Sequence, residues 1–284
     1  MRLVSFGPRG QERLGALVAG GEKILDLNKA DSSLPTCMLA FLNGNFWEKA
    51  KKVIADTPAS ALVDRKSVRL GAPIPKPGLI LCVGLNYKDH ATEQGLEWPK
   101  TPLLFGKSSN CATGPDDTIE YPEGIEQLDY EVELGVVIGK TAKKVPAAKA
   151  LEYVAGYTVV HDVSARCAQF GDKQWFRGKS CDTFAPFGPA LVTPDEVGDH
   201  ANLKLSCKVN GEVRQNSNTN QLIHTVPNII EYVTRTMTLS PGDVIATGTP
   251  SGVGVFFKPP KLLKRGDVVE LEIEKLGKLT NKVV

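Results

Sequence analysis

The sequence lacks the long apolar runs of a membrane protein. Its longest apolar stretches, such as LGVVIG and LILCVGL, fall far short of the ~20 residues that a membrane-spanning helix needs. The start of the chain reads as a strand and lacks the apolar core of a secretory signal. We therefore expect a protein that is neither membrane-bound nor secreted, while a trimmed leader leaves both a mitochondrial and a cytoplasmic location open.

Paired cysteines and basic blocks are also absent. The six cysteines have irregular spacings with no C-x-x-C pair, which is typical of reduced, structural thiols and gives little support to a zinc site or a cysteine nucleophile. Lysine and arginine total 34 against 32 acidic residues, so the net charge is only +2. Without a basic cluster, the sequence predicts no nucleic-acid partner.

A proline-rich segment, GAPIPKPG at residues 71–78, divides the chain. We expect a small N-terminal α+β domain over residues 1–72 and a larger domain over residues 73–284. In the first, the apolar spacing predicts strands at Leu3–Phe6 and Ala16–Val18 and a helix at Phe46–Ala55.

The larger domain reads mainly as strands. LILCVGL and YTVVHD are typical of buried strands, and residues 203–209 alternate before Asn210-Gly211, a strong hairpin-turn signal. One helix is expected within residues 224–237, with one apolar face formed by Ile229, Ile230, Val233 and Met237. Because regular crossover helices do not separate the strands, the pattern favours an α+β fold with a rolled sheet over a doubly wound one.

Acidic residues alternate in the strand-like segment LDYEVELGVVIGK. Glu131 and Glu133 would leave the same face about 6.5–7 Å apart, and at an effective dielectric near 20 their charges repel by roughly 2–3 kcal/mol. The alternative is a solvated strand face, as expected for ELEIE at residues 270–274, where lysines lie nearby. From residue 108 to 139, however, there is no lysine or arginine, so the earlier pair needs a cation or full solvation.

Asp162 adds a third carboxylate at the end of the strand GYTVVHD. Three carboxylates without a Cys/His cluster form a hard, all-oxygen site, which prefers Mg²⁺, or Mn²⁺, over zinc. His161 alternates to the opposite face and is expected to be a packed or hydrogen-bonded core histidine.

Several other residues are candidates for catalysis or binding. His90 and Glu93 would share one face of a helical turn, where the carboxylate holds one imidazole nitrogen and leaves the other free as a base; a plain surface pair is the alternative. The glycine-rich segment ATGTPSGVG, residues 246–254, is either a structural turn or a cradle for an anion. Three cations could grip an anionic substrate or remain ordinary surface charges: Lys107, Arg166 and Lys179.

Seven ordered motifs resemble the fumarylacetoacetate hydrolase superfamily, and the tail and N-terminal segment resemble its domain-containing protein 2 branch. The motifs are GLNYKDH with Glu93, FGKSS, DYEVELGVVIGK, GYTVVHDVSAR, QWFRGKSCDTFAPFGPALV, VNGEVRQNSNTNQLI and PGDVIATGTPSGVG. The resemblance implies a mixed β-roll catalytic domain over residues 73–284, usually in a homodimer. It implies metal ligands at Glu131, Glu133 and Asp162, with no assignment for Asp129.

The same resemblance implies site roles and a chemistry. The catalytic residues would be His90, Glu93 and Lys179, and the substrate-binding residues would be Lys107, Arg166, Gln169 and Thr249. The implied enzyme is Mg²⁺-dependent and acts on small 2-oxo acids through a metal-bound enolate. We favour oxaloacetate keto–enol tautomerisation, with decarboxylation as a related outcome. The alternatives are a C–C hydrolase of acylpyruvates or fumarylacetoacetate-like diketones, and a non-catalytic protein that binds metal and carboxylates.

Overall fold

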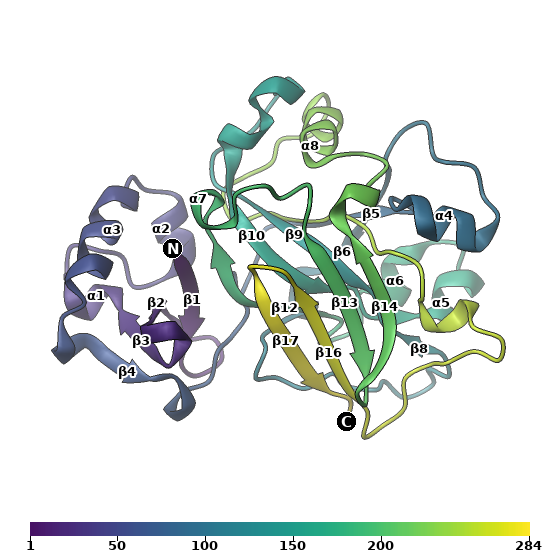
Figure 1. Cartoon of the computed structure of the whole chain (residues 1–284), viewed down its shortest axis with the longest axis horizontal. Coiled ribbons are helices and arrows are strands. Elements are labelled where there is room, and N and C mark those ends of the chain that lie inside the picture. Colours follow the sequence, from purple (N-terminus) through teal and green to yellow (C-terminus); the bar gives the residue numbers. More distant parts are fainter.

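A large mixed sheet runs through the whole molecule (Figure 1). The computed structural model describes all 284 residues. The sheet has 11 strands in the order β4-β3-β2-β1-β12-β10-β9-β15-β5-β6, with β7 paired to β12. Its strands are β1 Arg2–Phe6, β2 Arg13–Val18, β3 Lys23–Asp26, β4 Leu62–Asp64, β5 Ile80–Gly84, β6 Leu103–Lys107, β7 Ala112–Thr113, β9 Val132–Ile138, β10 Val154–His161, β12 Ala185–Val192 and β15 Val244–Ala246.

Two strand pairs in this sheet are parallel and the others are antiparallel. The parallel pairs are β15 with β5 and β12 with β7. Every residue of β9 and β10 is buried, which agrees with their nearly continuous apolar sequences. The predicted α+β class and the mixed sheet are therefore confirmed.

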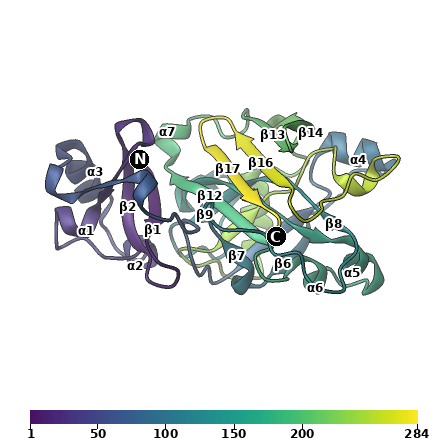
Figure 2. The same cartoon turned by 90° about the horizontal axis from the view of Figure 1, so that it is seen from below.

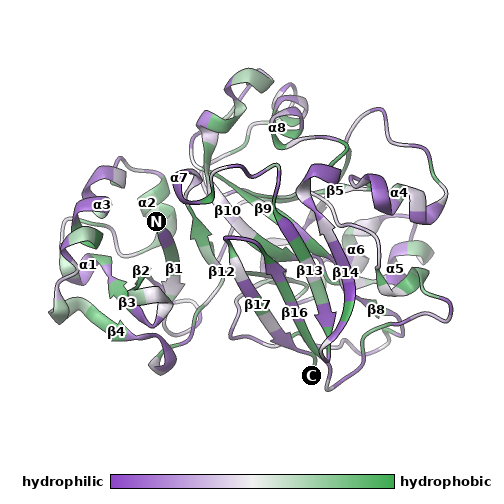
Figure 3. Cartoon of the chain, viewed as in Figure 1, coloured by the Kyte–Doolittle hydropathy of each residue, from purple (hydrophilic) through white to green (hydrophobic).

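A second sheet packs across the first. It contains four antiparallel strands in the order β14-β13-β16-β17, and Figure 1 shows it in front of β9, β10 and β12. Figure 3 shows hydrophobic and hydrophilic residues mixed along these strands, as expected when one face is buried and the other solvated. The strands are β13 Lys204–Val209, β14 Glu212–Asn218, β16 Val268–Ile273 and β17 Gly277–Lys282.

A hairpin turn joins β13 to β14, as predicted. Asn210 and Gly211 both have positive φ, at 51° and 81°, which is the backbone conformation of the favoured two-residue hairpin turn. In a further two-stranded pair, β8 Leu128–Asp129 ends two residues before β9, and its partner β11 Ser164–Ala165 begins two residues after β10. Glu131 and Asp162 therefore lie between short strands and long ones.

Helices are short, and most of them flank the sheets. They are α1 Leu27–Ala30, α2 Met38–Leu42, α3 Trp47–Asp56, α4 Lys88–Gln94, α5 Arg166–Gly171, α6 Trp175–Lys179, α7 Pro194–Val197 and α8 Val226–Thr234. None of the helices has the length and apolarity needed to cross a membrane. All six cysteines are free thiols, as expected.

One helix prediction needs a correction. Ile229, Ile230 and Val233 are buried on α8, as predicted. Met237 is not part of that face, because the helix ends at Thr234 and the methionine side chain is 39% exposed. The helical period simply does not continue past the last turn.

The N-terminal residues form a lobe made of β1–β4 and α1–α3, seen at one end of the molecule in Figures 1 and 2. The predicted strands and the predicted helix are all present in it. The lobe joins the rest of the large sheet through β1, which pairs with β12 at Arg2–Val192 and Leu3–Leu191. The exact division at residue 72 stays a prediction.

The central strands leave no room for a side chain at Gly156 on β10. A Cβ there would lie 2.4 Å from the carbonyl oxygen of Val192 on β12. We expect Gly156→Ala to lower the free energy of unfolding by about 1–3 kcal/mol, because a backbone strand must move. Urea titration followed by circular dichroism measures this change.

The matched control is Gly106→Ala on β6, where a new Cβ would meet its nearest atom, the oxygen of Ile80, at 3.8 Å. This variant should stay within about 0.5 kcal/mol of the parent protein. Equal stability of the two alanine variants would contradict the close packing of β10 against β12.

Candidate active site

Three buried carboxylates meet where β9 begins and β10 ends. Glu133 lies on β9, Glu131 directly precedes it, and Asp162 directly follows β10. The backbone N–H of Asp162 donates to the carbonyl oxygen of Glu131 at 3.0 Å, which fixes the two segments side by side. Each residue offers one carboxylate oxygen, and these three oxygens lie within 4.8 Å of one another. The three predicted ligands are thus brought together in a set that could hold a metal ion.

Two lysines compensate part of this negative charge. The Nζ atom of Lys179 donates to Glu131 and to Asp162, both at 2.8 Å. The Nζ atom of Lys107 donates to the other oxygen of Asp162 at 2.5 Å and to the carbonyl of Val163 at 3.1 Å. Burial alone would lower the pKa of Lys179, but Asp162 and Glu131 outweigh it and raise that pKa, so the lysine stays charged.

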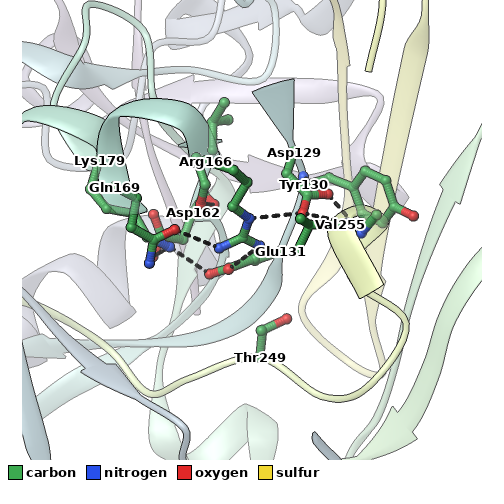
Figure 4. A network of polar contacts seen from close by, with 12 residues as sticks. Asp129, Tyr130, Glu131, Asp162, Arg166, Gln169, Lys179, Thr249 and Val255 are labelled. Carbon is green, nitrogen blue, oxygen red and sulfur yellow. Dashed lines mark hydrogen bonds and ion pairs between the residues drawn. The ribbon is translucent and has the colours of Figure 1, made fainter. Parts of the chain in front are cut away.

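Arg166, the first residue of α5, lies between two acidic side chains (Figure 4). Its guanidinium donates to Asp129 at 2.8 Å, to Glu131 at 2.7 Å and to the amide oxygen of Gln169 at 2.9 Å. Burial would raise the pKa of Glu131, yet Lys179 and Arg166 hold it well below its usual range. Glu131 is therefore ionised and fully paired.

Glu133 is the exception in the cluster. Its carboxylate is 2% exposed and accepts one hydrogen bond, from the backbone N–H of Gly248 at 2.9 Å. Burial, together with the charges of Asp162 and Glu131, raises its pKa well above the usual range. The site contains four buried carboxyl groups, counting Asp129, but only three cations, and Glu133 is the group left without a cationic partner. A divalent cation bound by oxygen ligands would fit this donor set.

The glycine-rich loop resolves the choice between a turn and an anion cradle. Its backbone N–H groups donate to acidic side chains of the chain itself: Gly248 to Glu133, Gly252 to Glu93, and Gly254 with the following Val255 to Asp129. The donor distances lie between 2.7 and 3.0 Å. The loop is thus a cradle whose anions are the protein's own carboxylates.

His90 lies on α4, as predicted, with Glu93 on the same face. The Nδ1 atom of His90 is 2.8 Å from a carboxylate oxygen of Glu93. The expectation that the second nitrogen is free is wrong, because the Nε2 atom lies 2.9 Å from the side-chain nitrogen of Gln94. No sequence signal marked Gln94, since an amide at the end of a helix is commonplace.

A cavity of about 190 Å³ is lined by most of these groups. Glu131, Glu133, Arg166, Gln169 and Lys179 form one part of its wall. Other polar lining residues are His90, Gln94 and Thr249, and the apolar rim comprises Leu96, Leu103, Phe105, Phe170, Trp175 and Phe256.

Three sequence-predicted site residues are not part of the cavity wall: Glu93, Lys107 and Asp162. The side chains of Lys107 and Asp162 are both completely buried and form an ion pair with each other. Thr249 lines the cavity, and its hydroxyl oxygen accepts a hydrogen bond from Gln215 at 2.8 Å. His161 is packed, as expected, but neither ring nitrogen has a hydrogen-bond partner; burial and Lys107 lower its pKa to about 3, so it is neutral.

A larger cavity of about 510 Å³ lies between the N-terminal lobe and residues 109–113. Its charged lining residues are Arg9, Glu12, Arg69 and Lys76, and the second and third of these form an ion pair with each other. None of the three clustered carboxylates reaches it. The smaller cavity is the better candidate for the active site, because Glu131, Glu133 and Lys179 line it.

Fold and site together define a class: mixed-sheet proteins with a buried, all-oxygen centre that could hold a metal ion. A family model described as fumarylacetoacetate (FAA) hydrolase C-terminal matches residues 79–284. The chain belongs to this family of enzymes. The resemblance inferred from the seven motifs is thereby confirmed.

Relatives match over the whole chain. A protein named oxaloacetate tautomerase Fahd2a, mitochondrial, from Rattus norvegicus is 48% identical, with 100% of this chain and 92% of the relative covered. A fumarylacetoacetate hydrolase domain-containing protein 2 homolog from Dictyostelium discoideum is 46% identical, covering 100% and 97%. The solved fumarylacetoacetate hydrolase from Exiguobacterium antarcticum is 38% identical, covers 100% and 99%, and superposes with a TM-score of 0.86. The similarity to the domain-containing protein 2 branch is also confirmed.

Asp129, left unassigned by the sequence, is a structural anchor. Its carboxylate is fully buried and joins Arg166 to the glycine-rich loop through Gly254 and Val255. We expect Asp129→Asn to lower the free energy of unfolding by about 3 kcal/mol, because it leaves a buried guanidinium short of an anionic partner. Urea titration at neutral pH measures the loss.

Glu272→Gln is the control for Asp129→Asn, since Glu272 lies on the solvated face of β16 near Lys278. The urea midpoint of this variant should match that of the parent protein. If Asp129→Asn were as stable as Glu272→Gln, the anchoring role would be wrong.

Proposed function

We propose that this protein is a Mg²⁺-dependent enzyme of small 2-oxo acids and that it catalyses the keto–enol tautomerisation of oxaloacetate. The observation that carries the proposal is Glu133, a buried carboxylate without a cation, directly beside the paired carboxylates of Glu131 and Asp162. The name of the relative from Rattus norvegicus, 48% identical over its match, supports the choice of reaction.

Glu131, Glu133 and Asp162 would hold the metal ion. Mg²⁺ suits three hard carboxylate oxygens best, and Mn²⁺ is the natural substitute. When bound, the ion supplies Lewis-acid polarisation of the carboxylate and the 2-oxo oxygen of the substrate. With the ion, the four carboxylates and three cations of the site would carry one excess positive charge, which suits an anionic substrate.

The side chains in the cavity wall have separate roles in this proposal. Arg166, Gln169 and Thr249 bind and orient the substrate. Lys179 faces the cavity next to Glu131 and Asp162, so its ammonium stabilises negative charge that develops on the substrate oxygen. Lys107 acts from behind the site, because its ammonium holds Asp162 in place.

His90 transfers the proton. Its Nε2 atom takes the proton from C3 of the substrate, and the electron pair of the broken C–H bond moves into the new C=C bond. Glu93 accepts the hydrogen bond from Nδ1–H and stabilises the positive ring. The π electron pair of the C2 carbonyl moves onto its oxygen, which takes a proton from the solvent, and His90 returns its own proton to the solvent.

We also propose the organisation of the protein. The N-terminal lobe and the family match from residue 79 onward support a small domain over residues 1–72 and a catalytic domain over residues 73–284. We propose a homodimer, with a small 2-oxo acid as the ligand and no nucleic-acid or membrane partner. A mitochondrial location, favoured over a cytoplasmic one, rests on the name of the relative from Rattus norvegicus.

Glu133→Gln tests the proposed metal site. We expect the Mg²⁺-dependent loss of enol-oxaloacetate, followed by its ultraviolet absorbance, to fall about 100-fold or more, because Lewis-acid stabilisation is worth several kcal/mol. The variant should also lose the rise in unfolding temperature that Mg²⁺ gives the parent protein.

A chelator should abolish the activity of the parent protein, and added Mg²⁺ should restore it. Glu272→Gln, on the solvated strand, is the control variant and should keep both the rate and the metal response. Unchanged Mg²⁺-dependent turnover by Glu133→Gln would contradict the proposed ligand set.

Hydrolysis is the competing reaction, since the solved structure at 38% identity is named a fumarylacetoacetate hydrolase. A panel of acylpyruvates separates the two activities, because cleavage releases pyruvate and a carboxylic acid. Faster release of these products than tautomerisation of oxaloacetate would replace the proposed reaction. Stabilisation by Mg²⁺ and oxalate without turnover of any 2-oxo acid would instead indicate a binding protein.

A further inference from the structure

Both ring nitrogens of His90 have polar partners within 3 Å. Glu93 lies at Nδ1, at 2.8 Å, and the side-chain nitrogen of Gln94 lies at Nε2, at 2.9 Å. A primary amide nitrogen can only donate a hydrogen bond, so Nε2 must accept, and the proton of the neutral ring is on Nδ1. Gln94 therefore contacts the lone pair that the proposed reaction uses.

The position of Gln94 suits it to respond to the contents of the cavity. It is the last residue of α4, four residues after His90 and therefore on the same face of the helix. His90 is 7% exposed, whereas Gln94 is half-buried, and both line the cavity. A substrate carbon can reach Nε2 only after the amide of Gln94 has moved aside.

We infer that Gln94 is a positioning residue that holds the proton-transferring nitrogen of His90 in both of its protonation states. The amide group has a donor and an acceptor at the same distance from the helix. Its N–H group donates to the neutral ring. When the amide group rotates by about 180°, its carbonyl oxygen accepts a hydrogen bond from the N–H of the protonated ring. The inference rests on the proposed role of His90, but the contact itself exists in the free enzyme.

A purely structural role for Gln94 makes a different prediction. If its side chain only covered the end of α4, any side chain of similar size would do. Gln94→Met keeps the length and removes both polar groups, whereas Gln94→Glu keeps the shape and leaves only acceptors. The two variants therefore have opposite effects on the Nε2 lone pair.

The rate of carbethoxylation by diethyl pyrocarbonate measures how accessible this lone pair is, since the imidazole reacts through an unprotonated nitrogen. The full chain and both variants are treated without metal or substrate, and the modification rate of the peptide containing His90 is measured by mass spectrometry. His200, which stacks on Tyr157 away from the site, is the internal standard.

We expect Gln94→Met to react at least about threefold faster at His90 than the parent protein, because the lone pair is uncovered. Gln94→Glu should react more slowly than the parent protein, because its carboxylate favours the protonated ring. Rates at His200 should not change. Rates at His90 that are equal in all three proteins, or that shift in the same direction in both variants, overturn the inference.

Steady-state kinetics tests whether the contact between Gln94 and His90 contributes to turnover. Gln94→Met should lower kcat about tenfold with KM within about twofold, since ring orientation and not substrate binding is lost. An unchanged kcat would overturn the positioning role. If the parent protein showed no turnover of oxaloacetate, the proposed function would fail, while the opposite modification rates would still demonstrate the contact between Gln94 and His90.

Discussion

Burial of charge is the constraint on which the rest of this structure depends. Four carboxylates, those of Asp129, Glu131, Glu133 and Asp162, lie together at 0–6% exposure. Removing one ion from water costs several kcal/mol even after relaxation, so each carboxylate needs close partners. Lys107, Arg166 and Lys179 supply cationic partners for three of them from separate segments of the chain, while Glu133 has only the backbone N–H of Gly248.

The glycine-rich loop extends the same principle to neutral donors. Backbone N–H groups have fixed positions, so they orient carboxylates without adding charge of their own. This one loop contacts Glu133 on β9 and Glu93 on the helix that carries His90. It also contacts Asp129, the ion-pair partner of Arg166. The proposed metal ligands, base and substrate-binding cation are thereby held relative to one another before any substrate arrives, which is the preorganisation that catalysis requires.

The sequence predicts those parts of the site that depend on local pattern. Alternation brings Glu131 and Glu133 to one face, the missing lysines and arginines mark the segment as unusual, and Asp162 follows a strongly apolar strand. The helix bearing His90 and Glu93 is also readable from spacing. These features need only a few neighbouring residues.

Long-range pairing is what the sequence does not reveal. Asp129 meets the loop 125 residues later, and Lys107 meets Asp162 across 55 residues, so neither contact has a local signal. Gln94 was missed for a different reason, because the geometry of the His90 ring, and not sequence spacing alone, makes its amide significant. Met237 shows that a helical pattern can run past the point where the backbone ends the helix.

The most direct test is a crystal structure with Mn²⁺ and oxalate, in which the anomalous signal of the metal gives its position without ambiguity. We expect one strong peak coordinated by carboxylate oxygens of Glu131, Glu133 and Asp162, with oxalate on the same ion and facing Lys179. A metal bound elsewhere, or a Glu133 side chain that remains uncoordinated beside an occupied site, would contradict it.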